Sequence, residues 1–170
     1  MSNSTKVYSV FLALVAAWCA GIVLAPLLAS GEPRMSSLLY SIYAPICHQI
    51  DARSMHIEGS KLAVCARCSG IYFSFLISVL LYPLFRRLAS PGVPNRWWLS
   101  IAILPMAADV FLTITGIHPG SIVTRAFTGI CFGAVLPFYL LPPLIEAVTQ
   151  LQTRRHPRGG LLYARKAQQT

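Results

Sequence analysis

The sequence predicts an all-α protein, an integral membrane four-helix bundle. Of its 170 residues, 55% are hydrophobic and only 11% are charged, a balance that is typical of membrane proteins. Four apolar stretches have the length of about 20 residues that a helix needs to cross a bilayer: residues 7–28, 64–85, 97–117 and 122–144. We therefore assign residues 1–149 to one transmembrane domain and residues 150–170 to a basic, disordered cytoplasmic tail.

The first helix, residues 7–28, follows a single basic residue, Lys6, and is ended by Gly31-Glu32-Pro33. The small residues Ala29 and Ser30 also admit a cleaved signal peptide. The apolar run is longer than the hydrophobic region of such peptides, so we expect an uncleaved helix.

A short amphipathic segment, residues 36–46, comes next, with Tyr40 and Tyr43 suited to the membrane interface. It is too short to cross the bilayer. The polar residues 49–62 then form the longest predicted outer connection, and loops of this length are often functional or held by a ligand.

The three remaining helices carry distinct signals. Arg86 and Arg87 end residues 64–85, and Trp97 with Trp98 begins residues 97–117 at an aromatic belt. In residues 122–144, Gly129-x-x-x-Gly133 predicts close helix packing, and prolines from position 137 onward predict a kinked end.

The basic residues predict the topology, because cytoplasmic segments of membrane proteins are enriched in Lys and Arg. The side that holds both termini has nine basic residues and one acid, or +8, whereas the other side has five and four, or +1. We therefore expect a multi-pass protein of the inner membrane with both termini in the cytoplasm. The net charge of +9 then reflects topology and contact with anionic lipids, not nucleic acid. No protein partner is indicated.

Four residues predict a metal site on the outer face: Cys47, His48, Cys65 and Cys68. Three thiolates and an imidazole complete a tetrahedral site for zinc first, and for copper second. With all four ligands bound, the site is closed and structural. With one ligand replaced by water or substrate, it becomes a Lewis-acid enzyme site.

The same cysteines admit redox chemistry or a static disulfide, because the outer face is oxidising. The architecture resembles disulfide-bond oxidase B and vitamin K epoxide reductase, which couple a CxxC at a helix start to quinone. Those enzymes relay electrons through a second cysteine pair, and here only Cys47 is available outside. A quinone-linked thiol oxidoreductase is therefore the alternative hypothesis.

Asp109 and Arg125 are the candidate catalytic pair beside this site, since a carboxylate within a membrane helix needs a partner. They form either a structural clamp or a base with an anion anchor. Weaker candidates are the loop histidines His56 and His118. Residues predicted to support the metal or to contact substrate are Gln49, Arg53, Arg67 and Tyr72. Arg67 would also lower the pKa of the neighbouring thiols.

The motif Cys47-His-Gln49, Arg53-Ser54, Gly59 and Cys65-Ala-Arg-Cys68-Ser-Gly-Ile-Tyr72 resembles the signature of a prokaryotic membrane-protein family, domain of unknown function twenty eighty-five. Its downstream Asp, Gly, Arg and Thr-Gly positions are matched by Asp109, Gly116, Arg125 and Thr128-Gly129. Ser74 departs from a further glycine, and residues 122–124 hold no asparagine. The resemblance implies a four-helix membrane protein and supplies no reaction.

Overall fold

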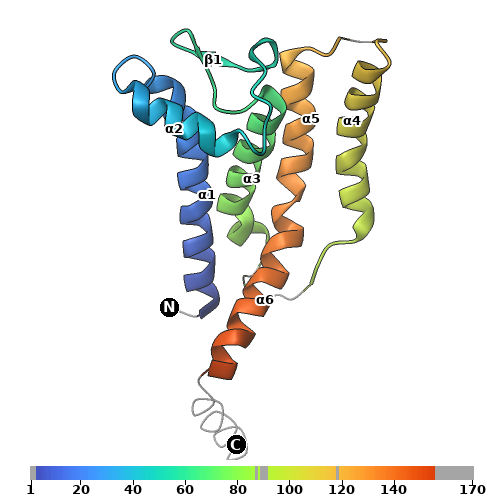
Figure 1. Ribbon diagram of the computed structural model, residues 1–170. Coiled ribbons are helices and arrows are strands. Elements are labelled where there is room, and N and C mark those ends of the chain that lie inside the picture. The colour runs from blue at the N-terminus through green and yellow to red at the C-terminus, as the bar shows by residue number, and fades with distance from the viewer. Residues whose placement is uncertain (1–2, 87, 89–91, 118, 156–170) are drawn as a thin grey trace, which may run out of the picture.

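The computed structural model describes residues 3–86, 88, 92–117 and 119–155, and its ordered elements are almost all helices (Figure 1). The helices are α1 (Asn3–Leu27), α2 (Pro33–Tyr43), α3 (Ala66–Phe85), α4 (Arg96–Ile114), α5 (Ile122–Val135) and α6 (Pro137–Arg155). A 3-10 turn, η1 (Asp51–Arg53), and a two-stranded hairpin, β1 (His56–Ile57) with β2 (Ser60–Lys61), lie between α2 and α3. The predicted all-α membrane fold is confirmed.

Four helical spans are long and apolar enough to cross a membrane among the described residues: Asn3–Leu27, Ala66–Phe85, Arg96–Ile114 and Ile122–Leu151. The start of α1 and the end of α6 lie at the same end of the bundle (Figure 1). The last span breaks between α5 and α6 at Pro137, and α6 continues through Pro142 and Pro143 to Arg155, beyond the predicted end at Leu144. Of the predicted tail, residues 150–155 belong to α6, whereas residues 156–170 and the candidate His118 lie outside the described residues.

The closest helix contact joins α3 to α5 through residues with little or no side chain. A Cβ atom added to Gly129 would overlap the backbone carbonyl of Arg67, and one added to Gly133 would overlap the carbonyl of Ile71. On the α3 side, Gly70 faces the carbonyl of Ala126 in the same way. The two backbones therefore touch directly, as predicted from the Gly129-x-x-x-Gly133 spacing.

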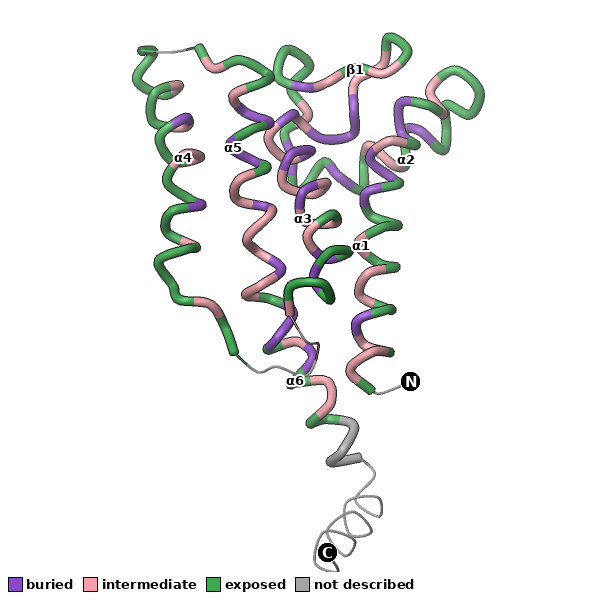
Figure 2. Tube along the Cα trace, turned by 180° about the vertical axis from the view of Figure 1, so that it is seen from behind, coloured by how far each residue is buried: buried purple, intermediate pink, exposed green. Residues whose placement is uncertain are grey.

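Helix α4 lies at the edge of the bundle and packs on α5 (Figure 2). Its buried residues are Ala102 and Asp109, and most of its other side chains are exposed on a surface that faces lipid in a membrane protein. Asp109 is therefore the polar group through which α4 reaches the interior.

Two prolines inside helices free backbone carbonyls, which are then used to hold other segments. Proline has no N–H, so the carbonyl four residues earlier loses its helical partner. In α1, Pro26 leaves the carbonyl of Ile22 free, and it accepts the N–H of Ala63 at 3.4 Å. In α3, Pro83 leaves the carbonyl of Val79 free, and it accepts the hydroxyl of Tyr8 at 2.9 Å.

The chain between α1 and α3 forms a cap that packs on the end of the bundle opposite the start of α1 (Figure 1). Its core is a cluster of buried residues from α1, α2 and the segment before α3: Ile22, Ala25, Tyr43, Cys47, Leu62, Ala63 and Val64. The hydroxyl of Tyr43 donates to the carbonyl of Trp18 at 2.6 Å, and that of Ser36 to Ala25 at 2.7 Å. These bonds fix the cap at one height on α1.

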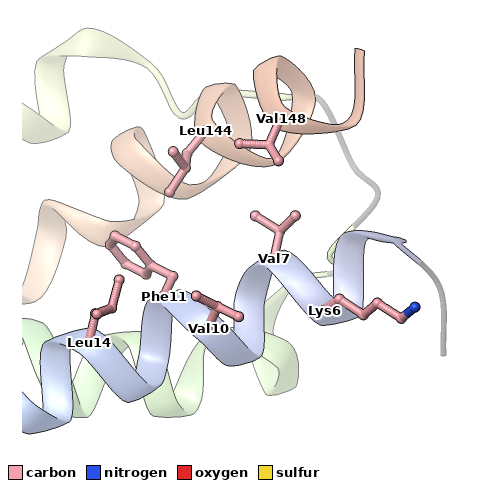
Figure 3. Close-up of a pocket in the computed structure, with 7 residues that line it drawn as sticks. All are labelled: Lys6, Val7, Val10, Phe11, Leu14, Leu144 and Val148. Carbon is pink, nitrogen blue, oxygen red and sulfur yellow. The ribbon is translucent and has the colours of Figure 1, made fainter. Parts of the chain in front are cut away.

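At the other end of the bundle, an apolar groove of about 350 Å³ lies between α1 and α6. Val7 and Phe11 of α1 face Leu144 and Val148 of α6 across it, while the amine of Lys6 points away (Figure 3). Its apolar lining suits lipid chains, and it lies away from the cysteines of the cap.

Candidate functional site

Three cysteines from two separate segments meet at the start of α3. The Sγ atoms of Cys47, Cys65 and Cys68 all lie within 4.8 Å of one another, and none of the three forms a disulfide. Cys47 is buried and the other two are partly exposed. The convergence of the Cys47 segment with the CxxC, which the sequence predicted, is therefore present in the fold.

The position of the CxxC at the start of α3 explains its local chemistry. Cys65 is the residue that precedes the first turn, with an extended backbone, and Cys68 is one turn further along. The pKa of the Cys65 thiol is lowered most by a hydrogen bond from the thiol of Cys68. It is lowered further by hydrogen bonds from the backbone N–H groups of Cys68 and Arg67 and from the thiol of Cys47. Together they outweigh desolvation and lower the pKa of the Cys65 thiol from 9.0 to about 5.

The pKa of Cys65 is lowered as predicted, but by a different group of Arg67 from the one expected. The guanidinium of Arg67 was expected to stabilise the thiolate, yet the contribution of Arg67 comes from its backbone N–H group. N–H groups at the start of a helix have no partner within the helix and carry partial positive charge, so they stabilise a nearby anion.

The spacing of the three sulfurs suits a tetrahedral metal ion. With Zn–S bonds of about 2.3 Å, two sulfurs on one zinc ion lie about 3.8 Å apart. The sulfurs lie within 4.8 Å of one another, so metal binding requires each pair to approach by no more than about 1 Å. In addition, the N–H of Cys65 donates to the Sγ of Cys47 at 3.1 Å, and such bonds orient metal-binding thiolates.

The loop that carries Cys47 is held by bonds to distant backbone groups. The side-chain amide of Gln49 donates to the carbonyl of Tyr40 at 2.7 Å, and the amine of Lys61 donates to the carbonyl of Gln49 at 2.8 Å. The hydroxyl of Tyr40 donates in turn to the carbonyl of Lys61. Gln49 has a φ of 50°, which is uncommon for a residue with a side chain, so these bonds stabilise an unfavourable backbone conformation next to His48.

Gln49 was predicted to contact substrate or to support the metal, and this stays a prediction; Gln49 lines the cavity, and its amide also fixes the loop. Tyr40, Lys61 and the buried Ser54, whose hydroxyl donates to Ile50 at 2.9 Å, are site-building residues that the sequence analysis missed. Their partners are backbone carbonyls, which leave no pattern in a sequence.

A cavity of about 210 Å³ lies over the cysteines. It is lined by Ile46, Cys47, His48, Gln49, Ile50, Arg53, Cys65, Arg67, Cys68 and Arg125. The predicted metal ligands therefore share one cavity with three arginines. The imidazole of His48 is exposed and is not one of the ligand atoms within 4.8 Å of one another, so its role as the fourth ligand stays a prediction.

Asp109 pairs with a different arginine from the one expected. The sequence analysis placed it with Arg125, but Nη2 of Arg67 donates to Oδ2 of Asp109, with side chains 20% and 7% exposed. The reason is geometric: the glycine contact sets α3 against α5 so that Arg67, in the first turn of α3, reaches past α5 to α4. Arg125 instead donates to the carbonyl of Pro119 at 3.4 Å.

The remaining candidates lie around this centre. Tyr72 packs behind the cysteines, with its ring 6.1 Å from that of Trp18, and Arg53 is exposed at the mouth of the cavity. His56 bonds to Asp51 at 3.1 Å on the exposed hairpin and is not part of the cysteine cluster.

Comparison with known proteins agrees with this picture. Residues 47–139 match the family described as predicted membrane protein (DUF2085). An uncharacterized protein of Methanocaldococcus jannaschii is 40% identical over 114 residues, which cover 67% of this chain and 73% of that protein. No solved structure matches the chain. The matched region begins at Cys47 and includes the CxxC, Asp109 and Arg125, and the chain belongs to this family of predicted membrane proteins, DUF2085.

Proposed function

We propose that this membrane protein binds a transition metal ion, zinc first and copper second, through Cys47, Cys65 and Cys68 at the outer end of its helical bundle. The observation that carries the proposal is that the three sulfurs lie within 4.8 Å of one another. Two of them come from the start of α3 and the third from a separate loop. The hydrogen bonds of that loop hold the third sulfur beside the other two.

The donor set favours this class of metal. Thiolates are soft ligands that prefer zinc and copper(I) to magnesium or calcium. Three protein ligands with one open position are typical of catalytic zinc, whereas four ligands are typical of structural zinc. The three cysteines and His48 line the same cavity of about 210 Å³, so a fourth ligand would come from this cavity. His48 therefore closes the site as a fourth ligand, or leaves it open for a substrate or water that the metal polarises.

The distribution of charge supports the orientation that places this site outside the cytoplasm. Lys6, Arg86 and Arg96 lie at the end of the bundle that holds the start of α1, and the cysteines lie at the opposite end. We propose that the termini are cytoplasmic and that the site faces outward from the inner membrane. Labelling of Cys65 by a membrane-impermeant maleimide in intact cells treated with a chelator tests this orientation, because the chelator frees metal-bound thiols on the outside and a site facing the cytoplasm would stay unlabelled.

Metal content and free thiols measured on the same sample test the metal proposal. The full-length protein, purified in detergent without reducing agent, is expected to hold about one zinc ion per chain and to show three thiols protected until a chelator is added. Cys47→Ser and Cys68→Ser are expected to lose the metal. Cys131→Ser, in the middle of α5 and outside the cluster, is the matched control. A Cys47→Ser protein with full metal content would refute the proposed ligand set.

The second candidate is a quinone-linked thiol oxidoreductase, and a specific groove favours it. An apolar groove of about 400 Å³, lined in part by Trp18, Tyr72 and Phe75, lies against the side of the bundle next to the cysteines. In this reaction the Cys65 and Cys68 thiols would give two electrons and two protons to a quinone, forming a disulfide and a quinol. The low pKa of the Cys65 thiol, about 5, supplies the attacking thiolate.

The same purified sample separates the two candidates. Metal-free protein with a Cys65–Cys68 disulfide and co-purifying quinone would refute the metal proposal. Zinc-protected thiols without quinone would refute the redox reaction. His48→Ala sharpens the result, because it is expected to weaken metal binding by about 10- to 100-fold if His48 is a ligand or orients one, yet it leaves a dithiol relay intact.

A further inference from the structure

The arginines around the cysteine cavity have more positive charge than the neighbouring residues neutralise. Arg53, Arg67 and Arg125 all line the cavity, and no Asp or Glu is among its described lining residues. Asp109 neutralises Arg67. Within the described part of the chain, no salt bridge involves Arg53 or Arg125, so two guanidinium groups remain without a counter-charge.

Arg125 is the more unusual of the two because it is buried. It is only 6% exposed, and its charge is opposed by Arg53 and Arg67 and favoured by Asp109 and Cys65. Its one hydrogen bond among the described residues goes to the carbonyl of Pro119, at 3.4 Å, which uses one of its five donors. Arg125 lines the cavity, and none of its nitrogen atoms is among the buried unpaired atoms of the described residues, so its remaining donors can bind an anion there, which would stabilise its charge inside a membrane protein.

The α4–α5 turn makes a specific place for this side chain. Gly120 has a φ of 67°, and a Cβ atom at this position would lie 2.9 Å from Nη2 and 3.2 Å from Nε of Arg125. The positive φ favours glycine in the turn, and the missing side chain leaves the space that the guanidinium occupies. The fold therefore places Arg125, on α5, and Arg53, on η1, in the lining of the same cavity.

We propose that this cavity binds an oxyanion of the phosphate type between Arg125 and Arg53, directly over the three sulfurs. Guanidinium groups recognise phosphate by paired, charge-assisted hydrogen bonds. Two of them approaching from different elements match a tetrahedral group with several oxygens better than a planar carboxylate. The ligand is either a soluble phosphate compound or the headgroup of an anionic phospholipid, since the cavity lies at the end of membrane-spanning helices.

The site does not depend on the metal proposed above. The two arginines that define it, Arg53 and Arg125, line the cavity beside the three cysteines whether or not a metal ion is bound. If the cysteines held a metal ion, an anion in this cavity would lie beside it and would be the candidate substrate group.

Binding of inorganic phosphate to the full-length protein in detergent, measured by calorimetry with and without zinc, tests the proposal. Arg125→Gln and Arg53→Gln are each expected to weaken binding by about 10- to 100-fold, and Arg125→Lys to restore part of it. The control is Arg34→Gln, an exposed arginine at the start of α2 that does not line the cavity. Because Arg53 is exposed, Arg53→Gln tests the site without disturbing the core.

A second arm distinguishes the two sources of phosphate. The protein is purified from membranes that contain phosphatidic acid and is examined by native mass spectrometry. If the headgroup is the ligand, wild type is expected to retain one phospholipid and Arg125→Gln is expected to retain none. Phosphate binding or retained phospholipid, dependent on Arg125 and Arg53, supports the site. The proposal is overturned if neither binds, or if Arg34→Gln weakens binding as much as Arg53→Gln.

Zinc content measured on the same samples keeps this result separate from the metal proposal. Phosphate binding by a protein that never holds zinc would leave the oxyanion site standing and refute the metal. If wild type and Arg125→Gln both bind zinc and neither binds phosphate or phospholipid, the metal proposal stands and the oxyanion site is refuted.

Discussion

Replacing Arg67 with methionine removes the partner of a carboxylate that lies inside a membrane helix. The Asp109 side chain is 7% exposed and that of Arg67 is 20% exposed, so little water reaches the pair. Removing one partner of such a pair typically costs about 3–5 kcal/mol, because the remaining charge is buried alone. For a chain of this size, each 1 kcal/mol lowers Tm by about 2–4 °C, so Arg67→Met should lower it by about 6–20 °C.

Thermal unfolding in detergent, followed by circular dichroism, measures this change. The matched control is Arg125→Met, which removes an arginine from the same cavity but no ion pair within the described residues. The double variant Arg67→Met/Asp109→Leu should recover much of the loss, since replacing both partners by apolar groups is often neutral. If Asp109 instead coupled energetically to Arg125 and independently of Arg67, the ion pair described above would be wrong.

Three further predictions concern the thiol, the helix contact and a freed carbonyl. In metal-free protein, the pKa of about 5 means that Cys65 is a thiolate above pH 5, so its alkylation rate, read by mass spectrometry, should rise through a midpoint near pH 5. A midpoint near 8.5, the value of an ordinary thiol, would contradict this. Gly129→Ala should destabilise the protein by about 1–3 kcal/mol through overpacking, whereas Gly31→Ala, with nothing within 4 Å, should be nearly neutral in the same unfolding measurement. Tyr8→Phe removes the bond to the carbonyl of Val79 and should cost about 1 kcal/mol; an unchanged Tm would show that this carbonyl finds another partner.

The sequence was sufficient for the spans and for the cysteine centre. Hydropathy alone predicted the four spans, because length and apolar character decide which segments a bilayer accepts. The meeting of Cys47 with the CxxC followed from the connection between them, which returns to the same end of the bundle. Gly129 and Gly133 predicted the α3–α5 contact, because only small residues allow backbones to approach so closely.

The ion pair and the loop needed the structure. Which arginine reaches Asp109 depends on the rotation of each helix about its own axis, and the backbone contact sets that rotation. The loop between α2 and α3 is held by side chains that donate to remote carbonyls, such as Lys61 to Gln49. Its hairpin had one local signal, Glu58-Gly59, where both residues have positive φ, as two-residue hairpin turns require. Pro142 and Pro143 predicted a kinked end to a helix that stops at Leu144, yet α6 continues through both to Arg155.

The carbonyl freed by Pro26 helps to set the depth at which the cysteine loop lies relative to the bilayer. The hydroxyls of Tyr43 and Ser36 hold α2 to other carbonyls of α1, and Pro26 adds an acceptor for a backbone N–H of the segment before α3. One missing N–H makes one carbonyl available, that of Ile22, and Ala63 binds there just before the CxxC. Moving the proline by one helical turn would shift this docking point by about 5.4 Å along the axis of α1. The position of Pro26 therefore contributes to the distance between the cysteines and the lipid.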